Sequence, residues 1–348
     1  MAWLSHREPR TPRRCRLWWR RVRAAGQVRQ QTAAGFGRPV GLGRCRGRST
    51  ERSRKRVCPR PFRRSRVIAG GAGKTQGVAN LAVEAAGRGH LVAVADFYPQ
   101  RSASHILGCQ DPPDGQPTIF DVLQGKHRLE EAVVPARYRI AEGDEDEAFR
   151  HIPDLDLILG TPETADAEAN LGLDPAGVLW LQNVLDEQIP QDRWDMMFFD
   201  CGPTLGILLL SIAMVGPEVI ACVADEFKYI IGLEDLEAPL DKGIRKFRRF
   251  GFKTEVQHIL ATNIPLKEDG GIRRSGGAVA DDAIKAIRSN PEWEPKLLPI
   301  IRRKQRFKDT IVTQRPLRFL DPRNEALEDI AAVADALGIQ RLNSTRKR

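Results

Sequence analysis

Short apolar runs alternate with longer amphipathic segments along most of this chain. Apolar runs that end in polar residues lie at 67–69, 91–95, 155–159, 196–199, 219–224, 256–261 and 297–301, and stretches with helical periodicity lie near 74–88, 163–187, 232–250, 278–288 and 323–337. Buried parallel strands have continuous apolar sequences of this kind, and helices connect them. The pattern predicts an α/β fold with a mostly parallel, twisted sheet and helices on both faces.

A glycine-rich turn joins the first predicted strand to the first predicted helix. Its sequence, GGAGKT at 70–75, matches a phosphate-binding loop in residue type and in context. Glycines let backbone N–H groups converge on phosphate oxygens, the helix N-terminus adds partial positive charge, Lys74 adds a full charge, and the Thr75 hydroxyl reaches Mg²⁺. The residues expected to bind nucleotide here are Gly70, Gly71, Ala72, Gly73, Lys74, Thr75 and Gln76.

A second motif is the apolar run at 194–200, which ends in Asp200. P-loop proteins place a carboxylate that holds Mg²⁺ at the end of such a strand. An aspartate in this place has an alternative role as a cap of a helix or turn. The order and spacing of loop and strand favour the metal role, so we expect Thr75 and Asp200 to hold the ion together.

A third segment, DFYPQ at 96–100, completes a pattern that resembles the ParA/MinD family of deviant Walker A ATPases, most closely its ParA-type DNA partition members. In that family the loop reads KGGxGKT, the switch segment reads DxDPQ, and the second strand ends in DxPx. Here the three segments read AGGAGKT, DFYPQ and DCGP. The likeness extends over about residues 67–338 and implies a P-loop NTPase fold with ATP and Mg²⁺ as cofactors.

The resemblance also implies a cellular role. It describes a cytoplasmic, nucleoid-associated bacterial protein that forms a homodimer around ATP, binds DNA nonspecifically, and acts in plasmid or chromosome partition with a ParB-type centromere-binding partner. The implied activity is weak hydrolysis of ATP to ADP and phosphate, with Lys74 and Asp96 as catalytic candidates. Asn263, just after the 256–261 run, is the candidate contact for adenine.

Two basic segments are candidates for the DNA contact. The candidates in the second segment, after the last predicted strand, are Arg302, Arg303, Lys304, Arg306 and Lys308. In the family this region also lines the adenine site, so Arg303 and Lys304 have the nucleotide as an alternative ligand. The first segment, 245–253, either contacts DNA or supplies favourable positive charge at a helix C-terminus.

Two positions depart from the family pattern and bear on activity. Ala69 stands where the family has a lysine that reaches the partner's phosphates, and Tyr98 stands where relatives have the aspartate that orients water. A phenol with a pKa of about 10 is a poor base near neutral pH. A non-hydrolysing, nucleotide-dependent scaffold or regulator of the same fold is therefore the alternative function.

The charge of the chain is divided unevenly. The net charge is +10, but residues 1–66 hold 21 Lys and Arg against two acids, a charge of +19, so the remainder is at −9. We expect residues 1–66 to be a disordered basic extension, 67–340 the ATPase domain, and 341–348 a basic tail. A targeting segment, a nucleic-acid-binding arm and a mis-assigned start are three accounts of the extension.

The cysteine and hydropathy patterns argue against a disulfide-rich, a cysteine-ligated metal-binding or a membrane-spanning protein. The six cysteines show no C-x-x-C pair or metal-ligand spacing, so we expect the protein to reside in a reducing cytoplasm. No apolar run approaches the roughly 18–20 residues that a membrane span needs. The last predicted helix is acidic, so an anionic membrane surface is not an expected partner.

Overall fold

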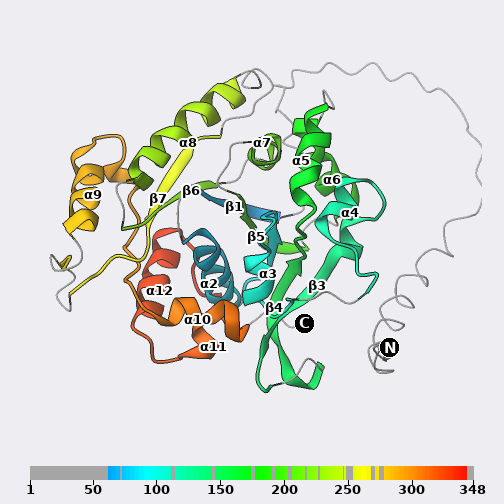
Figure 1. The fold of residues 1–348 in the computed structure, drawn as a ribbon, viewed down its shortest axis with the longest axis horizontal. Coiled ribbons are helices and arrows are strands. Elements are labelled where there is room, and N and C mark those ends of the chain that lie inside the picture. Colours follow the sequence, from blue (N-terminus) through cyan, green and yellow to red (C-terminus); the bar gives the residue numbers. More distant parts are fainter. Residues whose placement is uncertain are drawn as a thin grey trace, which may run out of the picture. The chain divides into compact units, whose positions relative to one another are not determined.

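The computed structural model describes residues 62–70, 73–110, 114–142, 146–173, 177–189, 193–202, 206–215, 218–225, 228–245, 247, 254–267, 271–273 and 278–342 (Figure 1). All of them belong to one compact unit, 58–348. Gly71 and Ala72 of the predicted phosphate-binding loop lie outside the described residues, and so do the first 61 residues and 343–348.

Seven strands form one sheet in the described part of the chain, in the order β3-β4-β2-β5-β1-β6-β7. Their bounds are β1 Phe62–Gly70, β2 Val92–Asp96, β3 Val133–Arg139, β4 Phe149–Ile158, β5 Trp194–Asp200, β6 Glu218–Val223 and β7 Val256–Ala261. Every neighbouring pair is parallel except β3 and β4. The predicted α/β class is therefore confirmed.

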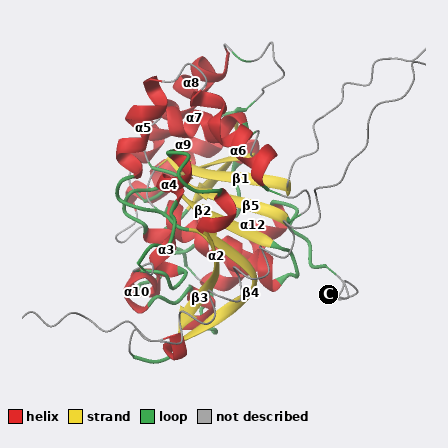
Figure 2. Cartoon of the chain, turned by 90° about the vertical axis from the view of Figure 1, so that its right-hand side faces the viewer, coloured by secondary structure: helices red, strands yellow, loops and turns green. Residues whose placement is uncertain are grey.

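Helices cover both faces of this sheet (Figures 1 and 2). They are α2 Lys74–Gly87, α3 Ser102–Ile106, α4 Ile119–Leu123, α5 Thr164–Leu173, α6 Trp180–Gln188, α7 Ile207–Met214, α8 Lys228–Arg245, α9 Ala278–Ser289, α10 Arg306–Thr313, α11 Leu317–Leu320 and α12 Ala326–Ala336. Helix α2 packs on the centre of the sheet with α12 behind it, and α8 and α7 lie on the opposite face. None of the described helices has the length and apolar character needed to cross a bilayer.

The structure corrects several predicted elements. The 297–301 run forms only isolated bridges, of Leu297 to Ile259 and of the following Arg302 to Ile264, because Pro299 cannot donate a ladder hydrogen bond. The predicted helix at 163–187 is divided into α5, a short 3-10 turn at Gly177–Leu179 and α6. The helix predicted at 232–250 instead runs as α8 from 228 and ends at 245.

Strand β3 was not predicted from the apolar pattern. Its side chains are mostly half-buried, and Pro135 lies at an irregularity in its pairing with β4. As the edge of the sheet, it donates backbone hydrogen bonds outward from Arg137 to Leu107 O and from Arg139 to Gln314 O. The sheet edge is thus covered by the segments after α3 and α10, which limits pairing with another chain.

The first strand begins before residue 67, the predicted start of the ATPase domain. Strand β1 begins at Phe62, and the Arg66 side chain is only 1% exposed. Its Nε lies 2.9 Å from a carboxylate oxygen of Glu218, and one guanidinium nitrogen donates to Leu337 O at 2.9 Å. A buried arginine is tolerated because Glu218 pairs its charge and its two terminal nitrogens donate hydrogen bonds, to Met196 Sδ and Leu337 O. Residues 62–66 therefore belong to the sheet.

Candidate functional site

The carboxyl ends of β1, β2 and β5 lie next to one another in the sheet, and Gly73 and Lys74 of the glycine loop follow the end of β1. Gly70 ends β1, and α2 begins at Lys74 after Gly73, whose φ of 87° lies in the left-handed region. A Cβ atom at Gly73 would lie 2.2 Å from Thr262 Oγ1, just past β7. Both the backbone conformation and the contact with Thr262 therefore require glycine at 73.

Thr75 and Asp200, the predicted metal ligands, contact each other. The Thr75 hydroxyl donates to Asp200 Oδ2 at 2.7 Å, while Asp200 Oδ1 is buried without a hydrogen-bond partner among the described atoms. Burial raises the pKa of Asp200 to about 8, and the nearby charge of Asp96 adds to the rise, whereas the Thr75 hydrogen bond opposes it. A buried carboxylate oxygen left unsatisfied beside a hydroxyl fits a hard divalent cation such as Mg²⁺.

Asp96 stands beside Asp200 in the register of β2 and β5. Its Oδ2 accepts hydrogen bonds from the backbone N–H and the hydroxyl of Ser104, both at 2.8 Å, and its Oδ1 accepts one from Tyr98 N at 3.2 Å. Burial raises the pKa of Asp96 to about 6 against these hydrogen bonds. Three donors hold this carboxylate, so it anchors the switch segment to α3, and its catalytic role stays a prediction.

Ser104 and Gly160 are parts of this arrangement that the sequence motifs did not indicate. Gly160 N donates to the Ser104 hydroxyl at 3.3 Å, and a Cβ at Gly160 would lie 2.8 Å from Asp96 O. The run of small residues after the switch segment was the only available signal for Ser104. Gly160 follows β4 without a recognisable motif, since the close approach that requires it is made by a strand about 60 residues earlier.

Lys74 and Tyr98 lie close together, just past the carboxyl ends of β1 and β2. The Lys74 ammonium lies 5.8 Å from the centroid of the Tyr98 ring, within the range of a cation–π interaction. The ring also lies against Gly202, where a Cβ would be 3.4 Å from a ring carbon. Tyr98 thus contacts the phosphate-binding lysine on one side and the chain just past Asp200 on the other.

Gln76 directs its side chain away from the loop. Its amide nitrogen donates to Phe307 O at 2.8 Å and to the Thr310 hydroxyl at 2.7 Å, both on α10. Asn80, one helical turn later, donates to Gln76 O and accepts from Leu317 N at 3.0 Å. The predicted role of Gln76 in nucleotide binding can therefore rest only on its backbone N–H, because its side chain ties α2 to α10.

Asn263 lies at the carboxyl end of β7 with a positive φ of 60°. Its amide donates to Asp225 Oδ1 at 3.0 Å, and Arg303 pairs with the other oxygen of the same carboxylate. Arg303 Nε also donates to Asn263 O at 3.3 Å. Asn263 and Arg303 therefore share one cluster around Asp225, and their roles toward nucleotide or DNA stay predictions.

A family profile described as an AAA domain matches residues 67–249, just over half of the chain. The matched segment contains the glycine loop, Asp96 and Asp200. The chain belongs to the ParA-type family of ATPases.

Relatives of this ParA-type chain include two proteins of Myxococcus xanthus. Chromosome partitioning protein ParA is 27% identical over 173 residues, which are 49% of this chain and 55% of that protein. Cell division protein PomZ is 24% identical over 268 residues, 76% of this chain and 74% of that protein. The chain spans about half the length of several of the curated relatives that it matches.

A solved structure of the Cyanothece McdA–ATP complex shares the fold. It superposes with a TM-score of 0.61 at 18% sequence identity and covers 82% of this chain and 100% of that one. The predicted P-loop NTPase fold is therefore confirmed.

The predicted DNA-binding residues of the ParA-type chain are mostly paired with acids. Arg302 donates through Nε and a terminal nitrogen to both carboxylate oxygens of Asp329, at 2.7 and 2.8 Å, and also contacts Glu325. These acids raise the pKa of Arg302 above its usual value. Arg302 is therefore better described as a structural residue that fastens α12 than as a DNA contact.

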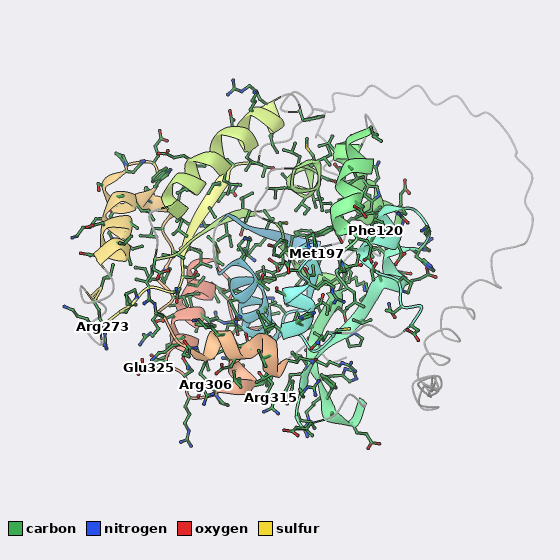
Figure 3. The ribbon with its side chains drawn as sticks, viewed as in Figure 1. Phe120, Met197, Arg273, Arg306, Arg315 and Glu325 are labelled. Carbon is green, nitrogen blue, oxygen red and sulfur yellow. The ribbon has the colours of Figure 1, made fainter. Side chains whose placement is uncertain are left out.

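Two of the remaining candidates also have acidic partners. Lys304 Nζ lies 2.9 Å from Glu325, and Arg306 lies 3.2 Å from Asp309 on its own helix. Figure 3 shows Arg306 and Glu325 at the outer edge of the molecule, on the side formed by α10 and α12. Lys308 is exposed on α10. In the other basic segment only 245 and 247 are described, and Arg245 pairs with Asp241.

Proposed function

We propose that this protein is a ParA-type, ATP-dependent partition ATPase that binds ATP with Mg²⁺, dimerises around the nucleotide and associates with nonspecific DNA. The observation that carries the proposal is the contact of Thr75, in the first turn of α2, with Asp200 at the end of β5, with one oxygen of Asp200 left unsatisfied. The two side chains supply the donor set that a nucleotide-bound Mg²⁺ requires.

The roles of the site residues follow from their positions. The loop around Gly73 and the first turn of α2 present backbone N–H groups to phosphate, and Lys74 adds a positive charge. Thr75 and Asp200 would hold the metal ion, which supplies neutralisation of the phosphate charge that develops during transfer. Asn263 and Arg303 form the side of the site at which a base would be recognised.

Partition as a role is supported by the relatives named chromosome partitioning protein ParA. We extend it to a ParB-type partner, a nucleoid-associated location in the cytoplasm, and a plasmid or chromosome as cargo. Because Arg302, Arg303 and Lys304 have acidic partners, Lys308 is the residue of the 302–308 segment best placed to contact DNA phosphates.

Equilibrium binding of ATP to the Lys74→Ala variant tests the nucleotide site. Loss of a charged phosphate contact weakens binding by at least about 10-fold, since hydrogen bonds to charged groups contribute about 1.5–3 kcal/mol each. Lys126→Ala removes an exposed lysine after α4 and is the matched control. Unchanged affinity in Lys74→Ala, with binding intact in the control, would overturn the assignment.

The alternative is a non-hydrolysing, nucleotide-dependent scaffold. It is favoured by the aromatic ring of Tyr98 against Lys74 and Gly202, in place of a carboxylate, and by Ala69, which is buried within β1. Steady-state phosphate release with DNA and a partner present separates the two functions. Tyr98→Asp raises turnover if Tyr98 alone limits hydrolysis, whereas binding without turnover in both proteins supports the scaffold.

A further inference from the structure

The Tyr98 ring has a fixed position between two parts of the site. The backbone N–H of Tyr98 donates to Asp96 Oδ1 at 3.2 Å, and Tyr98 O accepts from Arg101 N at 2.9 Å. Both hydrogen bonds belong to the turn that follows β2, and Asp96 is itself anchored to α3 through Ser104. The turn therefore fixes the backbone of Tyr98, and from this backbone the ring lies near Lys74 and Gly202.

A buried carboxylate and an aromatic ring are among the groups that interact with Lys74. Its positive charge lowers the pKa of Asp200, although burial outweighs that influence, and its ammonium also lies 5.8 Å from the centroid of the Tyr98 ring. A cation over an aromatic face is stabilised by about 0.5–1 kcal/mol at exposed sites, and more when water is excluded. The ring also lies close to Gly202, where an added Cβ would make an ordinary van der Waals contact with a ring carbon at 3.4 Å.

We propose that Tyr98 is a positioning residue for Lys74, holding the ammonium over its ring in the nucleotide-free protein. Phosphate oxygens of an incoming nucleotide then compete with the ring for the same ammonium. The ring thereby weakens nucleotide affinity while keeping Lys74 close to Asp200. This inference rests on the proposed function, because it assumes that Lys74 binds phosphate.

A comparison of Tyr98→Phe with Tyr98→Leu tests the inference through ATP affinity in the presence of Mg²⁺. Phenylalanine keeps the aromatic face, so Tyr98→Phe binds ATP like the parent protein. Leucine fills similar space without the aromatic face, so Tyr98→Leu binds ATP about 2–5-fold more tightly. Equal affinities of the two variants, or weaker binding by Tyr98→Leu, would overturn the inference.

The same two substitutions in the Lys74→Ala background distinguish an effect through Lys74 from a purely structural role of Tyr98. The quantity measured is again the ATP affinity. If the ring acts through the ammonium, replacing Phe by Leu at 98 has no effect on the residual ATP affinity once Lys74 is absent. An undiminished difference between Phe and Leu in that background contradicts the inference. Thermal melting of all variants checks that each is folded.

The outcomes for the two proposals are separable. Loss of ATP binding in Lys74→Ala with equal affinities for Tyr98→Phe and Tyr98→Leu keeps the proposed function and rejects the role of Tyr98. Unchanged ATP binding in Lys74→Ala rejects the proposed function itself.

Discussion

The Thr75 hydroxyl donates a 2.7 Å hydrogen bond to Asp200 Oδ2 across 125 residues of sequence. This contact joins the first turn of α2 to the end of β5 and leaves the other oxygen of a fully buried carboxylate unsatisfied. Asp96 lies next to Asp200 at the carboxyl ends of the neighbouring strands β2 and β5, so two buried acidic side chains are adjacent. Without a cation, this arrangement costs stability whenever both groups are ionised.

The free energy of unfolding should therefore fall as pH rises in metal-free, nucleotide-free protein. The pKa values are raised to about 6 for Asp96 and about 8 for Asp200, whereas an unfolded aspartate titrates at about 3.9. Between these values the folded state binds more protons than the unfolded state, and the slope of stability against pH is negative. Asp200→Asn removes one of the two groups, so its melting temperature falls less steeply from about pH 5 to pH 8.

Added Mg²⁺ provides a second measurement on the same variant. At pH 8, Mg²⁺ raises the melting temperature of the parent protein and not that of Asp200→Asn, because the ion binds the carboxylate. Asp114→Asn, which alters an exposed aspartate, behaves like the parent in both experiments. Parallel pH profiles for the parent and Asp200→Asn would contradict this account of the acidic pair.

Gly73→Ala should disrupt the loop for two separable reasons. A Cβ atom would lie 2.2 Å from Thr262 Oγ1, and φ of 87° disfavours any L side chain by about 1–2 kcal/mol. We expect a loss of at least about 2 kcal/mol in the free energy of unfolding, with ATP affinity reduced more than about 10-fold. Chemical denaturation and equilibrium binding measure the two effects.

Gly115→Ala is the matched control for the backbone conformation. Gly115 has a φ of 75°, and a Cβ there would meet no atom within 4 Å. Its substitution reports the conformational cost alone, so the difference between the variants measures the clash with Thr262. A loss in Gly73→Ala no larger than that in Gly115→Ala would show that the contact with Thr262 does not matter.

The convergence of Thr75, Asp96 and Asp200 was predictable because adjacent parallel strands bring their carboxyl ends to one edge of the sheet. Local sequence also sufficed for α2, where a glycine turn precedes a long apolar face. Strand β3 was missed since its half-exposed residues and Pro135 lack the apolar continuity of a buried strand. The strand formers Val133, Val134 and Tyr138 are present in it, but Pro135 and the charged residues interrupt the pattern.

The partners of the charged side chains could not be predicted from the sequence for a different reason. Arg302 binds Asp329, which is 27 residues away on α12, and Arg66 binds Leu337 O, which is 271 residues away. A cluster of basic residues gives the same signal whether its charges meet solvent, nucleic acid or acids of another element. Only the packing of α12 against the segment after β7 distinguishes these cases.

Arg302→Ala should destabilise the protein rather than impair DNA binding. Removing the guanidinium leaves the buried Asp329 carboxylate without its charged partner, although the backbone N–H of residue 302 still donates to it, and the cost is about 1–3 kcal/mol. Asp329→Ala has a similar effect, and the double variant is less destabilised than the sum, with a coupling of about 1 kcal/mol or more. Denaturant unfolding of the four proteins measures the cycle, and simple additivity would refute the structural role.

Lys308→Ala is the counterpart for DNA. Its side chain is exposed on α10, so stability changes by less than about 0.5 kcal/mol. Affinity for DNA falls uniformly across sequences, and the dependence of log affinity on log salt concentration loses about one unit of slope. DNA binding that is unaltered by Lys308→Ala but lost in a fully folded Arg302→Ala would reverse the assignment of these two residues.

Arg66 tests whether the sheet includes residues before 67. Arg66→Ala removes a buried guanidinium that joins β1 to Glu218 of β6 and to the chain after α12, and we expect a loss of about 2–4 kcal/mol. Arg150→Ala, at an exposed position of β4, is the control with little effect. For the same reason, a chain that begins at residue 62 unfolds at higher denaturant concentration than one that begins at residue 67. Equal stability of those two truncated chains, together with unchanged stability of Arg66→Ala, would show that residues 62–66 do not contribute to the stability of the sheet.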